Sequence, residues 1–220
     1  MQTESHTHTA NIRQALAALI GEEPLLPCLA EVLQKCRSQR GITFAEIQTA
    51  AGTEAHELLL LAWDFRLLLP RRSSRCAEWD DRIMRFEPGE IYDTVNIVDH
   101  LLSVAAQTGA WNVDKAAAGL YEQMGEPEYE KIPALIRRIT QLSENGQISA
   151  AGIHAACKRA GISGRAGDRT GDRTMNRTGA MIAILKGGGI ISPKLMSSSP
   201  AEKSGSPVYE LHPAITGALT

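Results

Sequence analysis

The sequence is poor in aromatic residues and cysteines, and it has no long apolar run. Aromatic residues make up 5% of its 220 residues, and its four cysteines are scattered without a C-x-x-C pair. Such pairs are the usual sign of a structural zinc or a redox dithiol, so we expect reduced thiols, no metal and no cofactor. No apolar run approaches the roughly 18 residues that span a membrane, and residues 1–9 lack the apolar core of a signal peptide. We therefore expect a cytoplasmic protein.

Catalytic motifs are also missing. Gly187-Gly188-Gly189 follows Lys186 and so inverts the order of a P-loop, and no G-x-G-x-x-G follows a strand. G-x-S-x-G and H-E-x-x-H are absent as well. We interpret His100 and His154 as surface or core histidines. The sequence therefore predicts that the protein is not an enzyme.

Charge is distributed unevenly along the chain. Residues 1–130 contain 11 basic and 20 acidic side chains, and residues 131–220 contain 12 and 5, so the halves carry −9 and +7. This asymmetry predicts that the C-terminal half binds a polyanion and the N-terminal half does not. The alternative is that the two halves attract one another.

The first unit is predicted over residues 10–87, after a polar segment, residues 1–9, that we expect to be a disordered tail. Gly41 ends a helix that begins near Pro27, and a short strand follows. Thr43 then caps the next helix, with Glu46 three residues later as in a capping box.

The unit continues with a helical turn and a hairpin. After the turn at Gly52, Thr53 is expected to cap a long helix over residues 54–68. Residues 71–79 and 82–86 are predicted to form a hairpin that turns at Asp80-Asp81, because Ile83 or Met84 alternates with charged neighbours, as in a half-exposed strand.

A helical connector is predicted over residues 88–128, with Pro88 at its start. Its first helix has the most regular apolar stripe in the chain, formed by Ile91, Val95, Val98, Leu101, Leu102 and Ala105. Because such a stripe requires a partner, a homodimer sealed by four of these residues is an alternative to a simple link between the units. The four are Ile91, Val95, Val98 and Leu102.

The second unit is predicted over residues 129–220. A helix ends at Asn145-Gly146, and the interval from Ile148 to Ile153 repeats that from Ile42 to Ile47 at an offset of 106 residues. A helix, a glycine-rich loop, a helix over about residues 174–186, a strand, a polar loop and a final strand follow.

Two segments follow one plan of strand, helix, turn, helix and strand: GITFAEIQTAAGTEAHELLLLAWDFRLLL and GQISAAGIHAACKRAGIS…MNRTGAMIAILKGGGIIS. In this plan the chain resembles the winged helix-turn-helix superfamily and, more loosely, the MarR-like bacterial regulators. The resemblance covers residues 27–86 and 132–211. It implies a mainly α fold with short β-hairpins as wings, built from two winged helix-turn-helix units and a helical connector.

The sequence departs from the superfamily at two places. The first copy has Phe65-Arg66 where members have a glycine that ends the recognition helix. The second has a glycine-rich insert, residues 163–174, where members have a tight turn. This insert is predicted as either helix or loop.

Arginines recur every fourth residue across the insert, at Arg165, Arg169, Arg173 and Arg177. A helix would align their guanidinium groups along one face, and a loop would let glycine amides approach phosphate. The alternative is local pairing with Asp168 and Asp172. Residues 158–177 contain six basic and two acidic side chains, so pairing cannot neutralise all of them.

If the second unit binds DNA, its last long helix enters the major groove by its amino-terminal end. Asn176 and Arg177 suit bidentate contacts with adenine and guanine, and Thr178 lies beside them. The other predicted DNA-binding residues hold phosphates from the flanking helix, the insert and the wing: Lys158, Arg159, Arg165, Arg169, Arg173 and Lys194.

We therefore predict a DNA-binding transcriptional regulator whose C-terminal unit contacts DNA and whose acidic N-terminal unit contacts protein. The alternative is a tandem winged-helix module that makes protein contacts within a larger complex and does not bind DNA.

Overall fold

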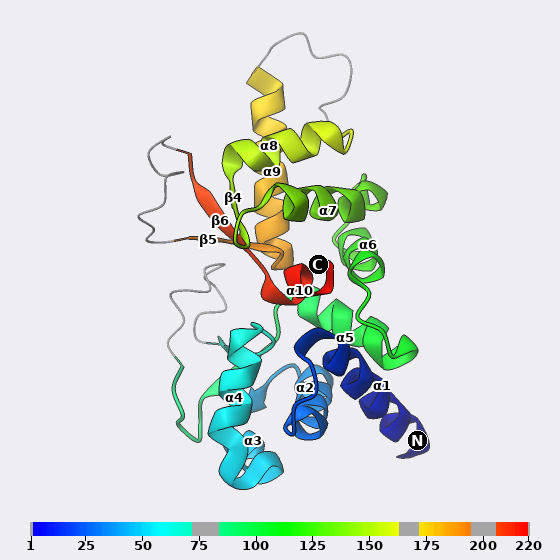
Figure 1. The fold of residues 1–220 in the computed structure, drawn as a ribbon, viewed down its shortest axis with the longest axis vertical. Coiled ribbons are helices and arrows are strands. Elements are labelled where there is room, and N and C mark those ends of the chain that lie inside the picture. Colours follow the sequence, from blue (N-terminus) through cyan, green and yellow to red (C-terminus); the bar gives the residue numbers. More distant parts are fainter. Residues whose placement is uncertain (1, 72–83, 163–171, 195–205, 220) are drawn as a thin grey trace.

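The two halves of the chain lie one above the other in the computed structural model (Figure 1), which describes residues 2–71, 84–162, 172–194 and 206–219. The first half combines helices with one small sheet. Its elements in chain order are α1 (Gln2–Ile20), α2 (Leu26–Gln39), β1 (Ile42–Thr43), α3 (Phe44–Ala51), the 3-10 turn η1 (Gly52–Glu54), α4 (Ala55–Asp64), β2 (Leu69–Pro70), β3 (Ile91–Asp93) and α5 (Asn96–Thr108).

The second half has the same kinds of element. They are α6 (Val113–Gln123), the 3-10 turn η3 (Tyr129–Lys131), α7 (Ile132–Leu142), β4 (Gln147–Ser149), α8 (Ala150–Arg159), α9 (Asp172–Gly188), β5 (Ile191–Pro193), β6 (Val208–Leu211) and α10 (Pro213–Leu219). The predicted fold class is confirmed: the chain is mainly α, with one small antiparallel three-stranded sheet in each half.

The two sheets repeat one another in order and in register. Their strand orders are β1-β3-β2 and β4-β6-β5, so in each the last strand of the half lies between the other two. Equivalent rows across the sheets carry the same residue types, and proline, which lacks an N–H, lies on an edge strand in both. The two rows are Ile42–Tyr92–Pro70 and Ile148–Tyr209–Pro193.

The helix that follows the first strand of each sheet is capped by a hydroxyl side chain. Thr43 Oγ1 accepts from the Glu46 N–H at 3.3 Å, and Glu46 Oε2 accepts from the Thr43 N–H at 2.9 Å, which confirms the predicted capping box. The hydrogen bond from the Thr43 backbone, with one from Lys35, lowers the pKa of Glu46 to about 2. In the second half Ser149 Oγ accepts from the Gly152 N–H at 3.1 Å.

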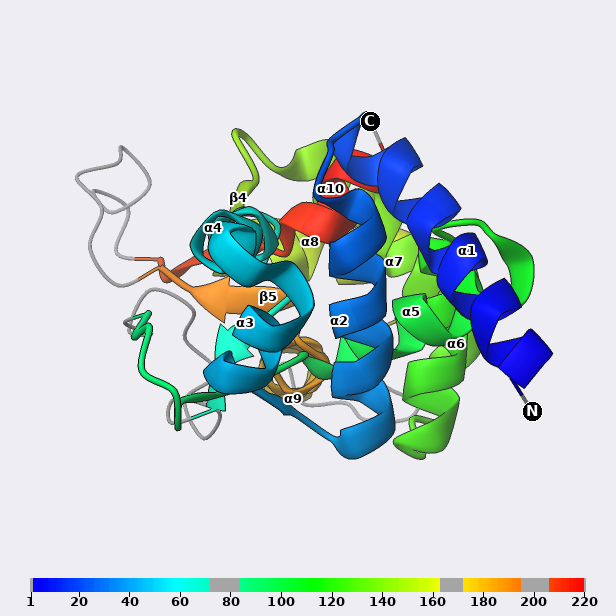
Figure 2. The ribbon, with the colours of Figure 1, turned by 90° about the horizontal axis from the view of Figure 1, so that it is seen from below.

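A continuous core joins the two halves. Helix α5 packs against α1 and α6, and α10 at the carboxyl end packs back onto α1 (Figure 2). Trp111 Nε1 donates to the Ala214 carbonyl at 2.9 Å, and Asn96 Nδ2 donates to the Gly187 carbonyl at 2.9 Å. The predicted helical connector is therefore part of the packed interior and not a separate arm.

The stripe predicted to seal a homodimer is arranged differently in the structure. Ile91 lies in β3, where it pairs with Thr43 of β1, and α5 begins only at Asn96, eight residues after Pro88. Val98 and Leu102 are fully buried against the chain's own helices. These two side chains are therefore not available to a second copy.

The first half differs from its prediction at three further points. Residues 2–9, expected to be a disordered tail, are the first turns of α1, which elongates from the anchored Ile12 and Leu16. Residues 84–86, predicted to lie in the second strand of a hairpin, form no strand, and the strand that pairs with β2 is β3. Helix α4 is shorter than predicted and follows η1, so Thr53 does not cap it.

Candidate nucleic-acid interface

Helix α9 is anchored at its carboxyl end and projects at its amino end. Met181 and Leu185 are buried in the core, and Tyr121 Oη donates to the Ile184 carbonyl at 3.4 Å. The first turns of α9 extend away from the rest of the molecule, above the crossing with α8 (Figure 1). The end that the sequence directs toward bases is therefore the outermost part of the helix.

The exposed face of α9 consists of small residues. Gly179, Ala180 and Ala183 are exposed. At the spacing of a helix, the same face continues through Asn176 and Arg173 in the first turns, whose side chains lie outside the described residues. At Gly179, Ala180 and Ala183 the backbone of α9 can approach a surface closely, because these three residues are small.

Arg177 points to the inside of the second half. Its Nη2 is paired with Glu128 Oε2 and lies 3.7 Å from Glu126 Oε1, both in the segment between α6 and α7. We call Arg177, Glu126 and Glu128 the arginine brace. Its guanidinium is thus engaged in holding α9 against this segment, whereas the sequence predicted a contact with bases.

The arginine brace extends to the turn after α8. Lys131 Nζ donates to Glu128 Oε1 at 2.6 Å and to the Gly161 carbonyl at 3.0 Å. The hydrogen bond from Lys131, together with the charge of Arg177, lowers the pKa of Glu128. Glu128 is therefore ionised at neutral pH, and its carboxylate binds both Lys131 and Arg177.

Thr178 also has a partner within the unit. Its Oγ1 lies 2.8 Å from His154 Nδ1 on α8. This hydrogen bond joins the two helices that lie between β4 and β5 in the chain. His154, which the sequence placed on a surface or in a core, thus fixes the angle at which α9 leaves α8.

Two of the predicted phosphate contacts lie on α8, the helix that packs against α9. Lys158 and Arg159 are exposed on the last turn of α8, where positive charge also complements the helix dipole. Lys194 is half-buried just after β5, and its N–H donates to the Val208 carbonyl at 3.0 Å. Arg165 and Arg169, with the aspartates predicted as their local partners, belong to segments whose side chains are not described. The structure therefore places two predicted phosphate contacts, Lys158 and Arg159, in the open.

The corresponding helix of the first half, α4, has a different outer face. Leu60 is 49% exposed, and Glu57 and Asp64 are exposed on the turns before and after it. The ring of His56 packs against those of Phe44 and Phe86, with centroids 5.2 and 4.6 Å away. This face is apolar and acidic, which suits a protein surface better than a phosphate backbone.

The described thiols are poor nucleophiles. Burial raises the pKa of Cys36 to about 12 and that of Cys157 to about 11, and Arg177 only partly opposes the second shift. Within the described ranges, no group of three histidine, cysteine or acidic side chains could hold a metal ion. No helix in that part of the chain is long and apolar enough to cross a membrane.

Sequence reasoning missed the partners of Arg177 and Thr178. Glu126 and Glu128 flank the helix breaker Pro127, and acidic residues that flank a break between helices were the available signal. The separation of 49 residues between Glu128 and Arg177 carries no periodicity that would join them.

Comparisons with known proteins give a family but no described relative. No curated protein and no solved structure matches the chain. The model of one protein family matches residues 10–219, a span that includes both sheets and the helices between them. The chain therefore belongs to this family, and the match covers both halves together.

Proposed function

We propose that the second half of the chain is a winged helix-turn-helix unit that binds duplex DNA, with α9 as its recognition helix. The element order α7, β4, α8, α9, β5 and β6 follows the plan of that superfamily and of the MarR-like regulators within it. The polar loop between β5 and β6 is the wing. In this proposal the protein is a cytoplasmic transcriptional regulator.

The observation that carries the proposal is the projecting amino end of α9 (Figure 1), together with the exposed Lys158 and Arg159 on the neighbouring α8. A recognition helix must enter a groove about 12 Å wide, which requires an unobstructed end. Positive charge must flank it to neutralise phosphates. The net charge of +7 on residues 131–220 supplies the long-range attraction.

Individual residues then take separate roles. Asn176 contacts the base edges, and Arg173, Lys158 and Arg159 hold phosphates. Arg165, Arg169 and Lys194 add contacts from the insert and the wing. Arg177 and Thr178 contribute through the arginine brace and the hydrogen bond to His154, which hold the helix at a fixed angle.

The test is the salt dependence of binding to a random-sequence duplex, measured by fluorescence anisotropy. We expect Lys158→Ala with Arg159→Ala to reduce the slope of log K against log salt by about 2, since each lost phosphate contact removes about 0.9. A matched control is Arg13→Ala with Lys115→Ala, two exposed basic residues on α1 and α6. Equal slopes for the wild type and the α8 variant would refute the proposal, as would absence of binding at low salt.

A second function is favoured by the outer face of α4. We propose that the first half contacts protein there, because Leu60 is exposed between acidic side chains. Leu60→Asp with Trp63→Ala should leave DNA binding unchanged and abolish this contact. If the same variant weakens DNA binding as strongly as the α8 variant, the two surfaces are not separate. If the chain binds no DNA, both halves would instead be protein-interaction units.

A further inference from the structure

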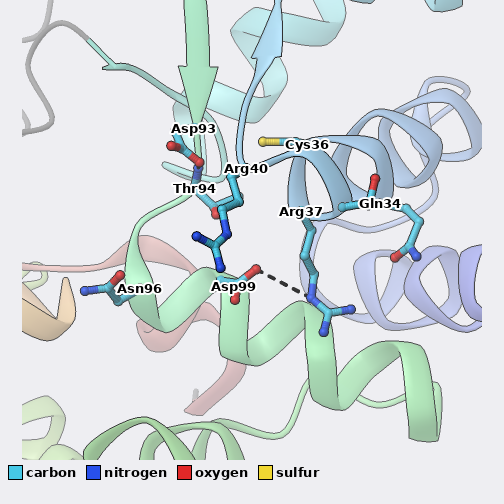
Figure 3. Close-up of a pocket in the computed structure, with 9 residues that line it drawn as sticks. Gln34, Cys36, Arg37, Arg40, Asp93, Thr94, Asn96 and Asp99 are labelled. Atoms are coloured by element: carbon cyan, nitrogen blue, oxygen red, sulfur yellow. Dashed lines mark hydrogen bonds and ion pairs between the residues drawn. The ribbon is translucent and has the colours of Figure 1, made fainter. Parts of the chain in front are cut away.

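An open groove of about 530 Å³ lies where α2 ends, β3 ends and α5 begins. Arg37 and Arg40 extend from α2 across it toward Asp99 on α5 (Figure 3). Thr94 and Asn96 form another side. The groove is on a different surface from the projecting end of α9, and neither half of the proposed function uses it.

Two arginines and two aspartates line the groove, and an excess of positive charge arises because Arg71, which lies outside the lining, pairs with one of the aspartates. Arg37 Nε lies 3.5 Å from Asp99 Oδ1, and its Nη2 donates to Ser103 Oγ at 3.0 Å. Asp93 is already paired with Arg71 at 2.9 Å, and it accepts from the Thr94 N–H. The guanidinium of Arg40 has no partner within the part of the chain that the structure describes, so one positive charge in the groove is unmatched.

Arg40 is an unexpected residue for its backbone position. It caps the carboxyl end of α2 in the left-handed conformation, with φ 57° and ψ 52°. Glycine or asparagine adopts this conformation with less strain. The backbone therefore gives no reason for an arginine here, whereas its side chain directs a free guanidinium across the groove.

We infer that this groove binds a small molecule that carries an oxyanion, either a carboxylate or a phosphate. The planar guanidinium of Arg40 matches either group with two parallel hydrogen bonds. Arg37 is already paired with Asp99, so the inference depends on the guanidinium of Arg40. The groove has the volume of ordinary small-molecule sites, so the oxyanion would be one end of a larger compound.

The rim of the groove also contacts α9. Asn96 donates to the Gly187 carbonyl in the last turn of α9. The next residue back, Val95, lies so close to Gly189 that a Cβ added there would be 2.9 Å from the Val95 Cβ. A ligand beside Asn96 is therefore one hydrogen bond away from the proposed recognition helix.

The binding test uses two-dimensional ¹H–¹⁵N spectra of the full chain, titrated separately with malonate and with inorganic phosphate at constant ionic strength. We expect saturable shifts of the Arg40, Thr94 and Asn96 amides with at least one probe, and the tighter probe identifies the oxyanion. Chloride at the same ionic strength is the reference. Shifts that never saturate, or that chloride reproduces, would overturn the inference.

Arg40→Asn is the decisive variant, because asparagine tolerates the left-handed conformation and removes the guanidinium. We expect the dissociation constant to rise about tenfold or more, whereas Arg13→Gln on α1 should leave it unchanged. Unchanged affinity in Arg40→Asn would also overturn the inference. No DNA is used, so failure here leaves the proposed DNA binding standing, and the converse holds as well.

Discussion

Helices α4 and α9 occupy equivalent places in the two halves, yet they present opposite surfaces. Each follows a capped helix and leads into the second strand of a sheet with the same order and register. The outer face of α4 has Leu60 between acidic residues, while that of α9 has glycine and alanine beside exposed basic residues. The shared framework fixes where a helix lies, and the side chains that do not pack decide what it can bind.

The two helices also end differently. Arg66 and Gly189 both have a positive φ, and each N–H donates to a carbonyl three residues back. Arg66 compensates for its strained backbone, because its guanidinium lies 4.8 Å from the Trp63 ring and its Nη1 donates to the Trp63 carbonyl. The missing glycine in the first copy is thus replaced by an arginine that makes its own local contacts.

The largest expected effect is a difference in stability between substitutions of the two equivalent tyrosines in the sheets, Tyr92 and Tyr209. Tyr92 is fully buried and its hydroxyl donates to the Arg85 carbonyl at 2.5 Å, whereas Tyr209 is partly exposed. Tyr92→Ala should reduce the free energy of unfolding by about 3–5 kcal/mol. Tyr209→Ala should cost about 1–2 kcal/mol, because less area returns to water. Urea unfolding measures both, and equal losses would contradict the difference in burial.

The next effect concerns the junction between the halves. His212 is fully buried, its Nδ1 accepts from the Ala214 N–H at 3.2 Å, and its Nε2 donates to the Arg66 carbonyl at 3.3 Å. Burial lowers the pKa of His212 from 6.5 to about 3. The folded state therefore keeps this ring neutral where the unfolded chain would take up a proton.

The stability that the neutral, buried ring of His212 contributes is fully present above pH 6.5, the pKa of histidine in the unfolded chain. It is lost as the pH falls from 6.5 toward 3, and the free energy of unfolding should decrease by on the order of 3 kcal/mol between pH 7 and pH 4. His212→Asn should be less stable at pH 7 but should lose less stability on acidification. Urea unfolding at a series of pH values tests this, with His100→Asn on α5 as the control. Parallel curves for the wild type and His212→Asn would contradict the prediction.

Substitutions at the carboxyl ends of α4 and α9 test the comparison of these two helices further. Gly189→Ala should cost about 2 kcal/mol, since its left-handed backbone and the nearby Val95 both oppose a Cβ. Arg66→Gly should change stability by less than about 1 kcal/mol, because relief of backbone strain offsets the lost contacts with Trp63. Thermal unfolding measures the stability of both variants. A larger loss of stability for Arg66→Gly than for Gly189→Ala would contradict the prediction.

The smallest effect is in the arginine brace. A double-mutant cycle of Arg177→Ala and Glu128→Ala should give a coupling energy of about 1 kcal/mol, because Arg177 is about a third exposed and solvent screens the pair. If the brace orients α9, the single variants should also weaken DNA binding with little change in the salt slope. A slope reduced by a full phosphate contact would instead place Arg177 on the DNA.

Local patterns predicted much of this fold. The capping box at Thr43 and the equal spacing from Ile42 to Ile47 and from Ile148 to Ile153 depend on residues close together in the chain, so the sequence displays them directly. The sheet register could not be predicted in the same way. The strand that pairs with Ile42 begins at Ile91, beyond a long connection whose alternating residues 82–86 were the more regular pattern.

The candidate site was predictable in composition but not in detail. Clustered basic residues near α9 were visible in the sequence, and Lys158 and Arg159 are exposed as expected. The inward turn of Arg177 depends on where the segment between α6 and α7 lies in space, which no local pattern encodes. The unmatched charge of Arg40 is a tertiary property for the same reason.

The prolines in the two sheets limit how this protein can be recognised. β2 and β5 are edge strands, and each contains a proline, at Pro70 and Pro193. A foreign strand laid along either edge would meet a position with no N–H to donate, so sheet extension and edge-to-edge aggregation are disfavoured there. Specific binding at these ends of the molecule is thereby left to side chains on helices, which can diverge between the halves while the sheets stay alike.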